Sequence, residues 1–197
     1  NLLYCIMRGR VVPMLSRRFR CIVPDLPLGA HLHPMHEGFD GAPETLGRIL
    51  HGVLDALEIG EAILTGNDSG GAYSQVAASQ HPERVRALVL NACESPYDPF
   101  PPVAFKGLSE AAKVPGNLAK LLSALRNRDV RKTPAAFGGL IKYTIPDEVS
   151  DSYALPALEV AGVCEDAVKA MRSASQASVA AAGQKLIADF RGQVLFV

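Results

Sequence analysis

An aspartate stands between glycines in the stretch LTGNDSGGAYSQ, residues 64–75, directly after a short apolar run. A strand, a tight glycine-flanked turn and a helix, in this order, form a nucleophile elbow, which lifts the side chain of the central residue to the carboxyl edge of a sheet. That central residue is held in a strained backbone conformation. The stretch therefore predicts that Asp68 is a nucleophile presented at the edge of a sheet.

The spacing of the glycines decides which residue is the centre of the turn. Small residues are needed two positions before and two positions after the centre, because the backbones of strand and helix pass close together. Around Asp68 these positions hold Gly66 and Gly70, whereas a turn centred on Ser69 would place the bulkier Asn67 there. The spacing therefore favours Asp68. The glycines assigned to the elbow are Gly66, Gly70 and Gly71.

The chemistry of a carboxylate at this position follows from its charge. With an ordinary pKa of about 3.9, an aspartate is ionised at neutral pH and needs no neighbouring base to act as a nucleophile. Its targets are electrophilic sp³ carbons, with which it forms an ester that a His-activated water then hydrolyses. The backbone N–H of Ser69 is expected to form one half of an oxyanion hole. The alternative is that Asp68 only caps the following helix.

The elements around the elbow alternate between strands and helices. Strands are expected over 19–27, 61–66 and 86–93, and helices over 45–59 and 71–85. This order predicts the α/β class, with a mostly parallel sheet flanked by helices.

The composition changes after the strand at 86–93. A Pro-rich connection, ESPYDPFPPVAF, leads into an Ala- and Leu-rich helical region, and GQVLFV at 192–197 predicts a strand that returns to the sheet. We expect a partial core with the elbow over 1–95, a helical cap lobe with a return helix over 96–190, and the start of a returning core strand over 191–197.

The segment GNDSGGAYSQVAASQHPERVRALVL resembles the elbow, helix and following strand of α/β-hydrolase fold proteins. It is most similar to the branch that holds haloalkane dehalogenases and epoxide hydrolases, in which Asp replaces Ser as the nucleophile. VVPMLSRRFRCIVPDLPLGAH at 11–31 and FPPVAF are similar to a group of bacterial α/β-hydrolases, and the resemblance covers roughly residues 10–197. It implies a covalent ester intermediate on Asp68 and a small-molecule substrate held between sheet and cap lobe.

The departures from this family bear on the substrate. Haloalkane dehalogenases carry Trp directly after the nucleophile, but here that residue is Ser69, and the chain contains no Trp. The expected substrate is therefore a small apolar electrophile, an epoxide more readily than a halide. Tyr143 and Tyr153 fall in the helical lobe and are candidates for donating to an epoxide oxygen, with half-buried packing as the alternative. Two other functions stay open: a Ser-type esterase acting through Ser69, and a catalytically silent member that binds a ligand.

The resemblance also implies an acid, a base and a second oxyanion donor. Glu94 follows the strand at 86–93 and is the candidate acid, with Asp98 as the weaker alternative. The family's catalytic His comes after a later strand, and its "HG" loop precedes the region around Arg10, where NLLYCIMRG does not contain it. We therefore expect an incomplete chain, truncated at both ends, that carries out at most one stoichiometric reaction. Its exposed sheet edge predicts poor stability or self-association.

The remaining signals limit the partners. The net charge of zero gives no electrostatic case for nucleic acid or an anionic membrane surface. No metal or cofactor is expected: His31, His33 and His36 predict a polar loop at the rim of the cleft rather than a metal site, and His51 and His81 are expected at the surface. The four cysteines include no C-x-x-C pair, and such ordinary thiols indicate a reducing compartment. The sequence shows no signal peptide and no apolar run long enough to span a membrane, so the expected location is by default the cytoplasm. The four cysteines are Cys5, Cys21, Cys93 and Cys164.

Overall fold

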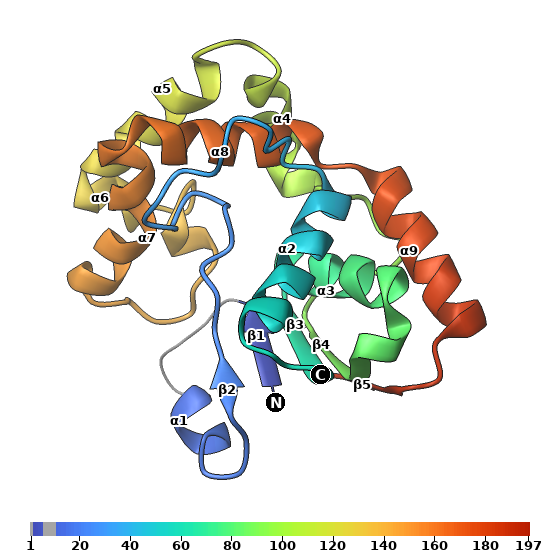
Figure 1. Cartoon of the computed structure of the whole chain (residues 1–197). Helices are drawn as coiled ribbons and strands as arrows, with labels where there is room; N and C mark the ends of the chain where they lie inside the picture. The colour runs from blue at the N-terminus through green and yellow to red at the C-terminus, as the bar shows by residue number, and fades with distance from the viewer. Residues whose placement is uncertain (1, 6–10) are drawn as a thin grey trace. The chain divides into compact units, whose positions relative to one another are not determined.

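The chain folds into two compact units (Figure 1). The computed structural model describes residues 2–5 and 11–197. The first unit consists of 1–25, 42–106 and 174–197, and the second of 26–41 and 107–173. The second unit therefore includes the loop 26–41 as well as most of the helical region. Residues 6–10, before which the resemblance implies an "HG" loop, lie outside the described residues.

A five-stranded parallel sheet forms the centre of the first unit, with the strand order β2-β1-β3-β4-β5. The strands are β1 (Leu2–Cys5), β2 (Cys21–Ile22), β3 (Ala62–Asn67), β4 (Val85–Asn91) and β5 (Gln193–Phe196). The all-parallel arrangement confirms the expected fold class, because parallel neighbours need crossover connections such as helices.

Two strands differ from the sequence expectation. β1 was not predicted, because four apolar residues carry too little pattern to distinguish a strand from other short runs. The strand expected over 19–27 is reduced to β2, which pairs with β1 only at Cys21 and Ile22. Pro24 has no backbone N–H to donate, so the pairing cannot continue far along the chain.

Helices of the first unit pack on one another and on the sheet. They are α1 (Val12–Leu15), α2 (Pro43–Ala56), α3 (Ser69–Gln80) and α9 (Gln176–Asp189), with short 3-10 turns at Pro82–Arg84 and Val103–Phe105. α3 packs on β3 and β4 and lies between α2 and α9 (Figure 1). α3 is built from small residues and is buried along nearly its whole length. It therefore brings its own N-terminus, next to Asp68, into the core of the unit.

The second unit is helical. Its helices are α4 (Lys106–Ala112), which begins at the boundary between the units, α5 (Asn117–Ser123), α6 (Arg128–Arg131), α7 (Asp147–Glu159) and α8 (Ala161–Ser173). Two 3-10 turns join them, at Ala124–Arg126 and Phe137–Gly139. Within the described part of the chain, every helix is too short or too polar to cross a membrane.

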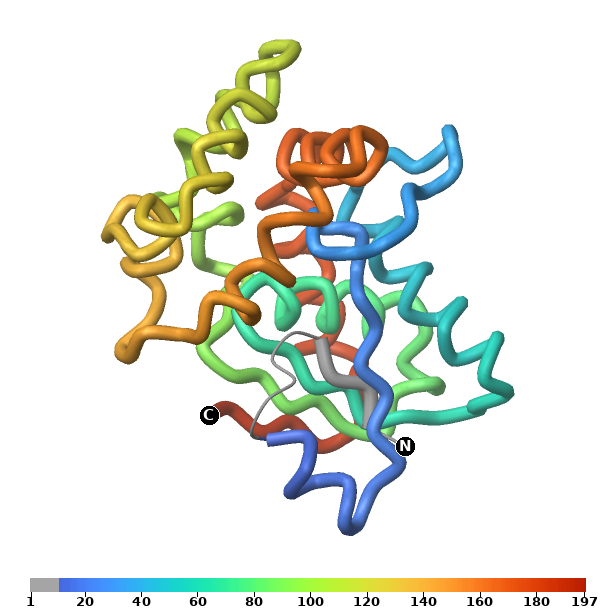
Figure 2. Tube along the Cα trace, turned by 90° about the vertical axis from the view of Figure 1, so that its left-hand side faces the viewer, coloured from blue at the N-terminus to red at the C-terminus, as the bar shows by residue number. Residues whose placement is uncertain are grey.

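A buried hydrogen bond between His31 and Asp166 joins the loop 26–41 to α8, along which this loop runs (Figure 2). Asp166 is 2% exposed and His31 5% exposed, and His31 Nε2 lies 3.2 Å from Asp166 Oδ2. The same carboxylate oxygen accepts the backbone N–H of Met35 at 2.7 Å. The Nδ1 atom of His31 faces the N–H of Gly29 at 3.4 Å, so Nε2 is the nitrogen that donates to Asp166.

Asp166→Ala should lower the free energy of unfolding by about 2–4 kcal/mol, because it leaves the N–H of Met35 and the ring of His31 buried without their acceptor. Urea unfolding followed by circular dichroism measures the change. Glu165→Ala is the matched control, since Glu165 is an exposed neighbour on the same helix and should change stability by less than about 0.5 kcal/mol. Equal effects of the two substitutions would contradict a structural role for the pair.

Candidate active site

The turn between β3 and α3 holds Asp68 in a conformation that is rare for residues with a side chain. Its φ is 52° and its ψ is −137°, whereas Ser69 is already the first residue of α3. Such a backbone costs of order 1–3 kcal/mol and persists only where its surroundings enforce it. Here the N–H of Asp68 donates to the carbonyl oxygen of Asn91 at the end of β4, at 3.3 Å. The residue that occupies the apex of the turn is therefore Asp68 rather than Ser69.

The glycines beside Asp68 are required by close backbone approach. A Cβ on Gly66 would lie 2.4 Å from the Cα of Gly71 and 2.5 Å from the carbonyl oxygen of Gly70. A Cβ on Gly71 would lie 2.3 Å from the Cβ of Cys93, which follows β4. Strand β3 and helix α3 thus touch through backbone atoms at Gly66, and the side chain of Cys93 fills the space beside Gly71, so neither position has room for a side chain.

The carboxylate of Asp68 is oriented by the start of α3. Its Oδ1 accepts the backbone N–H of Ser69 at 2.7 Å, and the Ser69 hydroxyl lies 3.4 Å from the same oxygen. The positive end of the helix dipole adds to this stabilisation of negative charge, by roughly 0.3–1 kcal/mol. The backbone therefore fixes the position of Oδ1 relative to α3.

Glu94 lies just beyond β4 and is buried, at 7% exposure. Burial raises the pKa of its carboxyl group, and the nearby charges of Asp68 and Asp98 raise it further. Its Oε2 is buried without a hydrogen-bond partner among the described residues. Asp98, the weaker candidate, is exposed and accepts the backbone N–H of Ser95 at 3.0 Å, and hydrogen bonds from Ser95 lower its pKa. Glu94 is thus the better placed of the two for a role beside Asp68.

Glu94→Gln should raise the free energy of unfolding at neutral pH. The pKa of Glu94 is higher in the folded chain than its ordinary value of 4.5 in the unfolded chain. At a pH between these two pKa values the folded chain binds more protons than the unfolded chain. The free energy of unfolding therefore falls as the pH rises from 4.5 through the raised pKa. The glutamine removes this loss. Urea unfolding of both proteins across this pH range measures the difference, which should grow from pH 4.5 upward.

Glu83→Gln is the control of opposite sign for this prediction. Hydrogen bonds from its own backbone N–H and from His81 lower the pKa of Glu83, so its substitution should not stabilise the folded chain. A pH-independent difference between wild type and Glu94→Gln would contradict the account of Glu94.

Sequence reasoning missed several polar groups that support the turn. The side chain of Gln75 on α3 donates to the carbonyl oxygen of Glu94 at 2.8 Å, which ties the loop after β4 to the helix. Asn91 Nδ2 donates to Asn67 Oδ1 at 2.9 Å and links the ends of β4 and β3. Asparagines at the last positions of two neighbouring strands are the signal that could have indicated this pair. Tyr73 is buried, and its ring meets that of Phe100 edge to face at 5.9 Å.

Two expectations about histidines were wrong. His31 was placed in a polar loop at the rim of the cleft, but it is buried against Asp166, a carboxylate 135 residues later in the chain. His51 was placed at the surface, but it is 6% exposed, and its Nε2 donates to the carbonyl oxygen of Ala77 at 2.8 Å, because the small residues of α3 let α2 approach closely. Burial lowers the pKa of His51. His33, His36 and His81 are exposed.

The tyrosines considered as donors both lie in the second unit and are exposed. Tyr143 is 75% exposed, and the amine of Lys142 lies 5.6 Å from the centre of its ring. Tyr153 is 46% exposed and meets the ring of Phe137 edge to face at 6.3 Å. Neither hydroxyl is therefore sequestered within the packing of its own unit.

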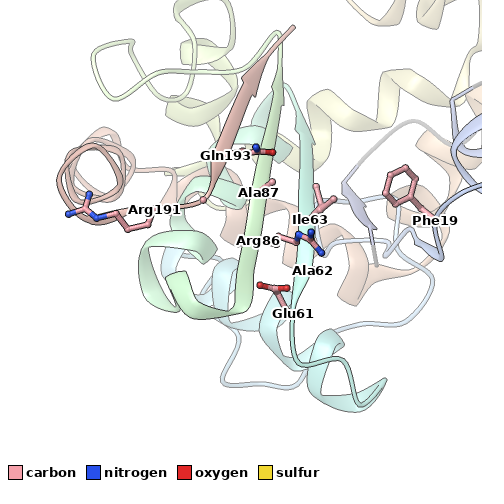
Figure 3. A pocket seen from close by; sticks show the side chains of 9 residues that line it. Phe19, Glu61, Ala62, Ile63, Arg86, Ala87, Arg191 and Gln193 are labelled. Carbon is pink, nitrogen blue, oxygen red and sulfur yellow. The ribbon is translucent and has the colours of Figure 1, made fainter.

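A cavity of about 650 Å³ in the first unit lies at the amino-terminal ends of the strands, whereas Asp68 follows a carboxyl-terminal end (Figure 3). It is lined by residues where β3, β4 and β5 begin, including Glu61, Arg86 and Gln193. Asp68 follows the end of β3, so this cavity is not part of the elbow.

The comparison with protein families agrees with this geometry. The model of the family described as alpha/beta hydrolase fold matches residues 4–145. The chain therefore belongs to the α/β-hydrolase fold family, as its elbow and parallel sheet indicate. This confirms the resemblance inferred from the sequence.

Curated relatives include hydrolases of several kinds. The 2-hydroxy-6-oxo-2,4-heptadienoate hydrolase of Pseudomonas putida is 42% identical over 80 residues, which are 41% of this chain and 29% of that protein. Haloalkane dehalogenase 2 of Mycobacterium tuberculosis is 32% identical over 80 residues, which are 41% of this chain and 28% of that protein. The match thus spans less than a third of the length of these relatives.

Solved structures share the fold over nearly the whole chain. The epoxide hydrolase CorEH superposes with a TM-score of 0.74 at 16% identity, over 99% of this chain and 72% of that one. The haloalkane dehalogenase DbeA of Bradyrhizobium elkanii superposes with a TM-score of 0.68 at 18% identity, over 99% of this chain and 72% of that one. At such identities the likeness establishes the fold alone.

Proposed function

We propose that the protein is a hydrolase in which Asp68 attacks a small apolar electrophile and forms a covalent ester. The observation that carries this proposal is the elbow conformation of Asp68, with Oδ1 held by the N–H of Ser69 at 2.7 Å. A carboxylate used only as a helix cap needs neither a strained backbone nor glycines in backbone contact on both sides. Strain of this kind is concentrated at functional sites.

The mechanism follows from the two carboxylate oxygens. Oδ2 attacks a ring carbon of an epoxide, the carbon–oxygen bond of the ring breaks, and the alkoxide takes up a proton. The ester carbonyl oxygen is then Oδ1, which already accepts the N–H of Ser69. When water attacks the ester carbon, it gives up a proton that replaces the one taken up by the alkoxide, and negative charge develops on Oδ1, which this N–H stabilises. Collapse of the intermediate releases a diol and restores the carboxylate of Asp68.

Supporting roles are proposed for three further residues. Glu94, buried beside the charge of Asp68, is the acid that would orient an imidazole base. Tyr143 and Tyr153 are the candidate donors of the proton to the epoxide oxygen, since both hydroxyl-bearing side chains are exposed. An epoxide is favoured over a haloalkane because Ser69, which follows the nucleophile, has no ring N–H to bind a departing halide.

A second candidate function is hydrolysis of an unsaturated oxo-acid. It is favoured by 42% identity over 80 and 81 residues to two Pseudomonas enzymes named for such substrates, the heptadienoate hydrolase and 2-hydroxymuconate semialdehyde hydrolase. A third, a Ser-type esterase, would need Ser69 as nucleophile, but this residue lies in the first turn of α3 rather than at the apex.

Mass spectrometry of the acid-quenched protein tests the proposal. After incubation with styrene oxide, we expect an adduct of the epoxide's mass on the peptide that contains Asp68. An adduct of a fluorophosphonate on Ser69 would instead indicate an esterase. Tight binding of the epoxide with no adduct and no diol would indicate a silent, ligand-binding member of the family.

A further inference from the structure

A second cavity, of about 220 Å³, lies within the second unit, between α6 and the start of α7. Its described lining contains three basic side chains, those of Arg131, Lys132 and Lys142, and no carboxylate. We call it the basic cavity. Since the chain as a whole has a net charge of zero, this concentration of positive charge is local.

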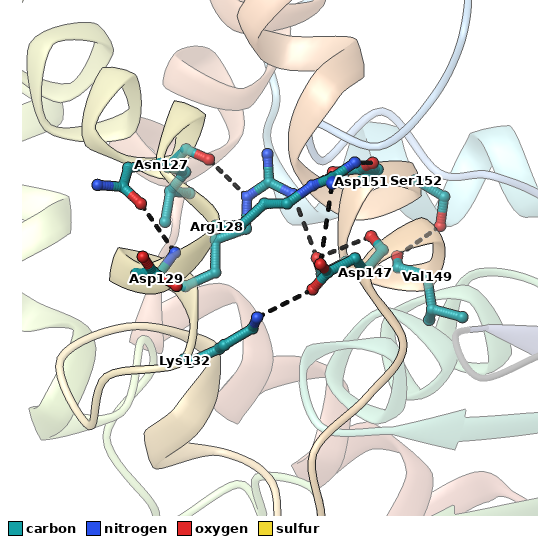
Figure 4. Close-up of polar contacts among 11 residues, drawn as sticks. Asn127, Arg128, Asp129, Lys132, Asp147, Val149, Asp151 and Ser152 are labelled. Atoms are coloured by element: carbon teal, nitrogen blue, oxygen red, sulfur yellow. Dashed lines mark hydrogen bonds and ion pairs between the residues drawn. The ribbon is translucent and has the colours of Figure 1, made fainter.

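Carboxylates of α7 pair with the cations of α6 and with Lys132 near the basic cavity (Figure 4). Asp151 binds both Arg128 and Arg131, with nitrogen–oxygen distances of 2.5 Å. Asp147 binds Lys132 at 3.2 Å. Arg128, Arg131 and Lys132 are thus each paired with a carboxylate, and the charge of Glu148 acts on Arg128 as well.

Lys142 adds a further positive charge at the basic cavity. Its amine lies 5.6 Å from the centre of the Tyr143 ring, and within the described part of the chain it has no carboxylate partner. Its ammonium group is therefore free to approach an anion in the basic cavity.

Arg131 is fixed in place before any ligand arrives. Its side chain is 2% exposed, its Nε donates to the carbonyl oxygen of Leu125 at 2.5 Å, and its Nη1 donates to the hydroxyl of Ser150 at 3.2 Å and to Asp151. A rigid guanidinium at a cavity wall suits the planar geometry of a carboxylate.

Part of the lining is apolar, and the volume of the cavity restricts the size of the ligand. Phe137, Ile141 and Ile145 contribute hydrophobic surface. The volume is below the roughly 300–1,000 Å³ of sites for drug-sized molecules. We propose that the basic cavity binds a small monocarboxylate, with its carboxylate toward Lys142 and Arg131 and its apolar part against Phe137, Ile141 and Ile145. An inorganic anion such as phosphate has no apolar part and would leave this surface unused.

Titration of the full chain with benzoate, followed by amide NMR, tests the proposal. We expect shifts confined to residues that line the basic cavity, such as Thr144 and Ile145. Benzamide, the neutral analogue of the same shape, should bind at least about tenfold more weakly, because hydrogen bonds to a charged group are stronger than those to a neutral one.

Lys142→Gln is the informative variant, since Lys142 is exposed and the fold does not depend on an ion pair there. It should weaken benzoate binding about tenfold or more. Lys120→Gln, the same change at an exposed position of α5, should leave binding unchanged. The proposal is overturned if benzoate does not bind at millimolar concentration, if benzamide or phosphate binds as tightly, or if the two lysine variants behave alike.

Discussion

Asp68→Asn should abolish formation of the ester and lower any turnover by about 10⁴-fold or more, because a neutral amide is not a nucleophile and covalent catalysis cannot start without one. The two side chains have nearly the same shape, so the amide oxygen can still accept the N–H of Ser69 and the fold should be kept. The measurement is the rate of diol formation together with the mass of the quenched protein.

Ser69→Ala is the control for this first prediction. Its backbone N–H remains, so the adduct on Asp68 should still form, and only an esterase acting through the Ser69 hydroxyl would lose activity. If Asp68→Asn keeps the wild-type rate while Ser69→Ala loses it, the assignment of the nucleophile is wrong.

Gly66→Ala should destabilise the protein by at least about 4 kcal/mol, or prevent folding, because its new Cβ would lie 2.4 Å from the Cα of Gly71. The position of a Cβ is fixed by the backbone and the Cα of Gly71 is a backbone atom, so no side-chain rotation can relieve the overlap. Strand β3 and helix α3 would have to separate, which breaks the packing of the first unit. Urea unfolding, or the fraction of protein recovered in folded form, measures the effect.

Gly52→Ala is the matched control for this second prediction. Gly52 lies in the interior of α2 with open space where a Cβ would stand. Alanine there should stabilise the protein by roughly 0.5–1 kcal/mol, because glycine loses more conformational freedom on folding. Tolerance of Gly66→Ala at the level of Gly52→Ala would contradict the close strand–helix contact.

The sequence predicted most elements of the sheet and its helices. α2, β3 and β4 lie within a few residues of their expected ranges, because α2 has apolar residues at helical spacing and β3 and β4 are short apolar runs. α3 ends at Gln80, five residues before its expected end, and a 3-10 turn follows from Pro82. The apex of the turn could be assigned to Asp68 because Gly66 and Gly70 stand two positions before and two positions after it. β1 escaped prediction because a short apolar run has no distinctive period.

Contacts between residues far apart in sequence could not be predicted in this way. His31 meets Asp166 across 135 residues, and no local pattern relates the two. The same holds for His51, whose burial depends on how closely α3 approaches α2. The sequence predicted that Glu94 follows a strand. It could not predict that Oε2 of Glu94 is buried without a hydrogen-bond partner among the described residues, because this burial depends on the path of the loop after β4, which Gln75 holds in place.

A single-turnover reaction in oxygen-18 water tests the central claim most directly. With the protein in excess over a terminal epoxide, the oxygen added to the diol should come from Asp68, so the heavy isotope should appear in the carboxylate of the peptide that contains Asp68 and not in the diol. If the ester is not hydrolysed, the same peptide should carry the epoxide's mass, which identifies the same nucleophile. Heavy oxygen in the diol, with an unlabelled and unmodified Asp68, would contradict the account, because water would then attack the substrate directly.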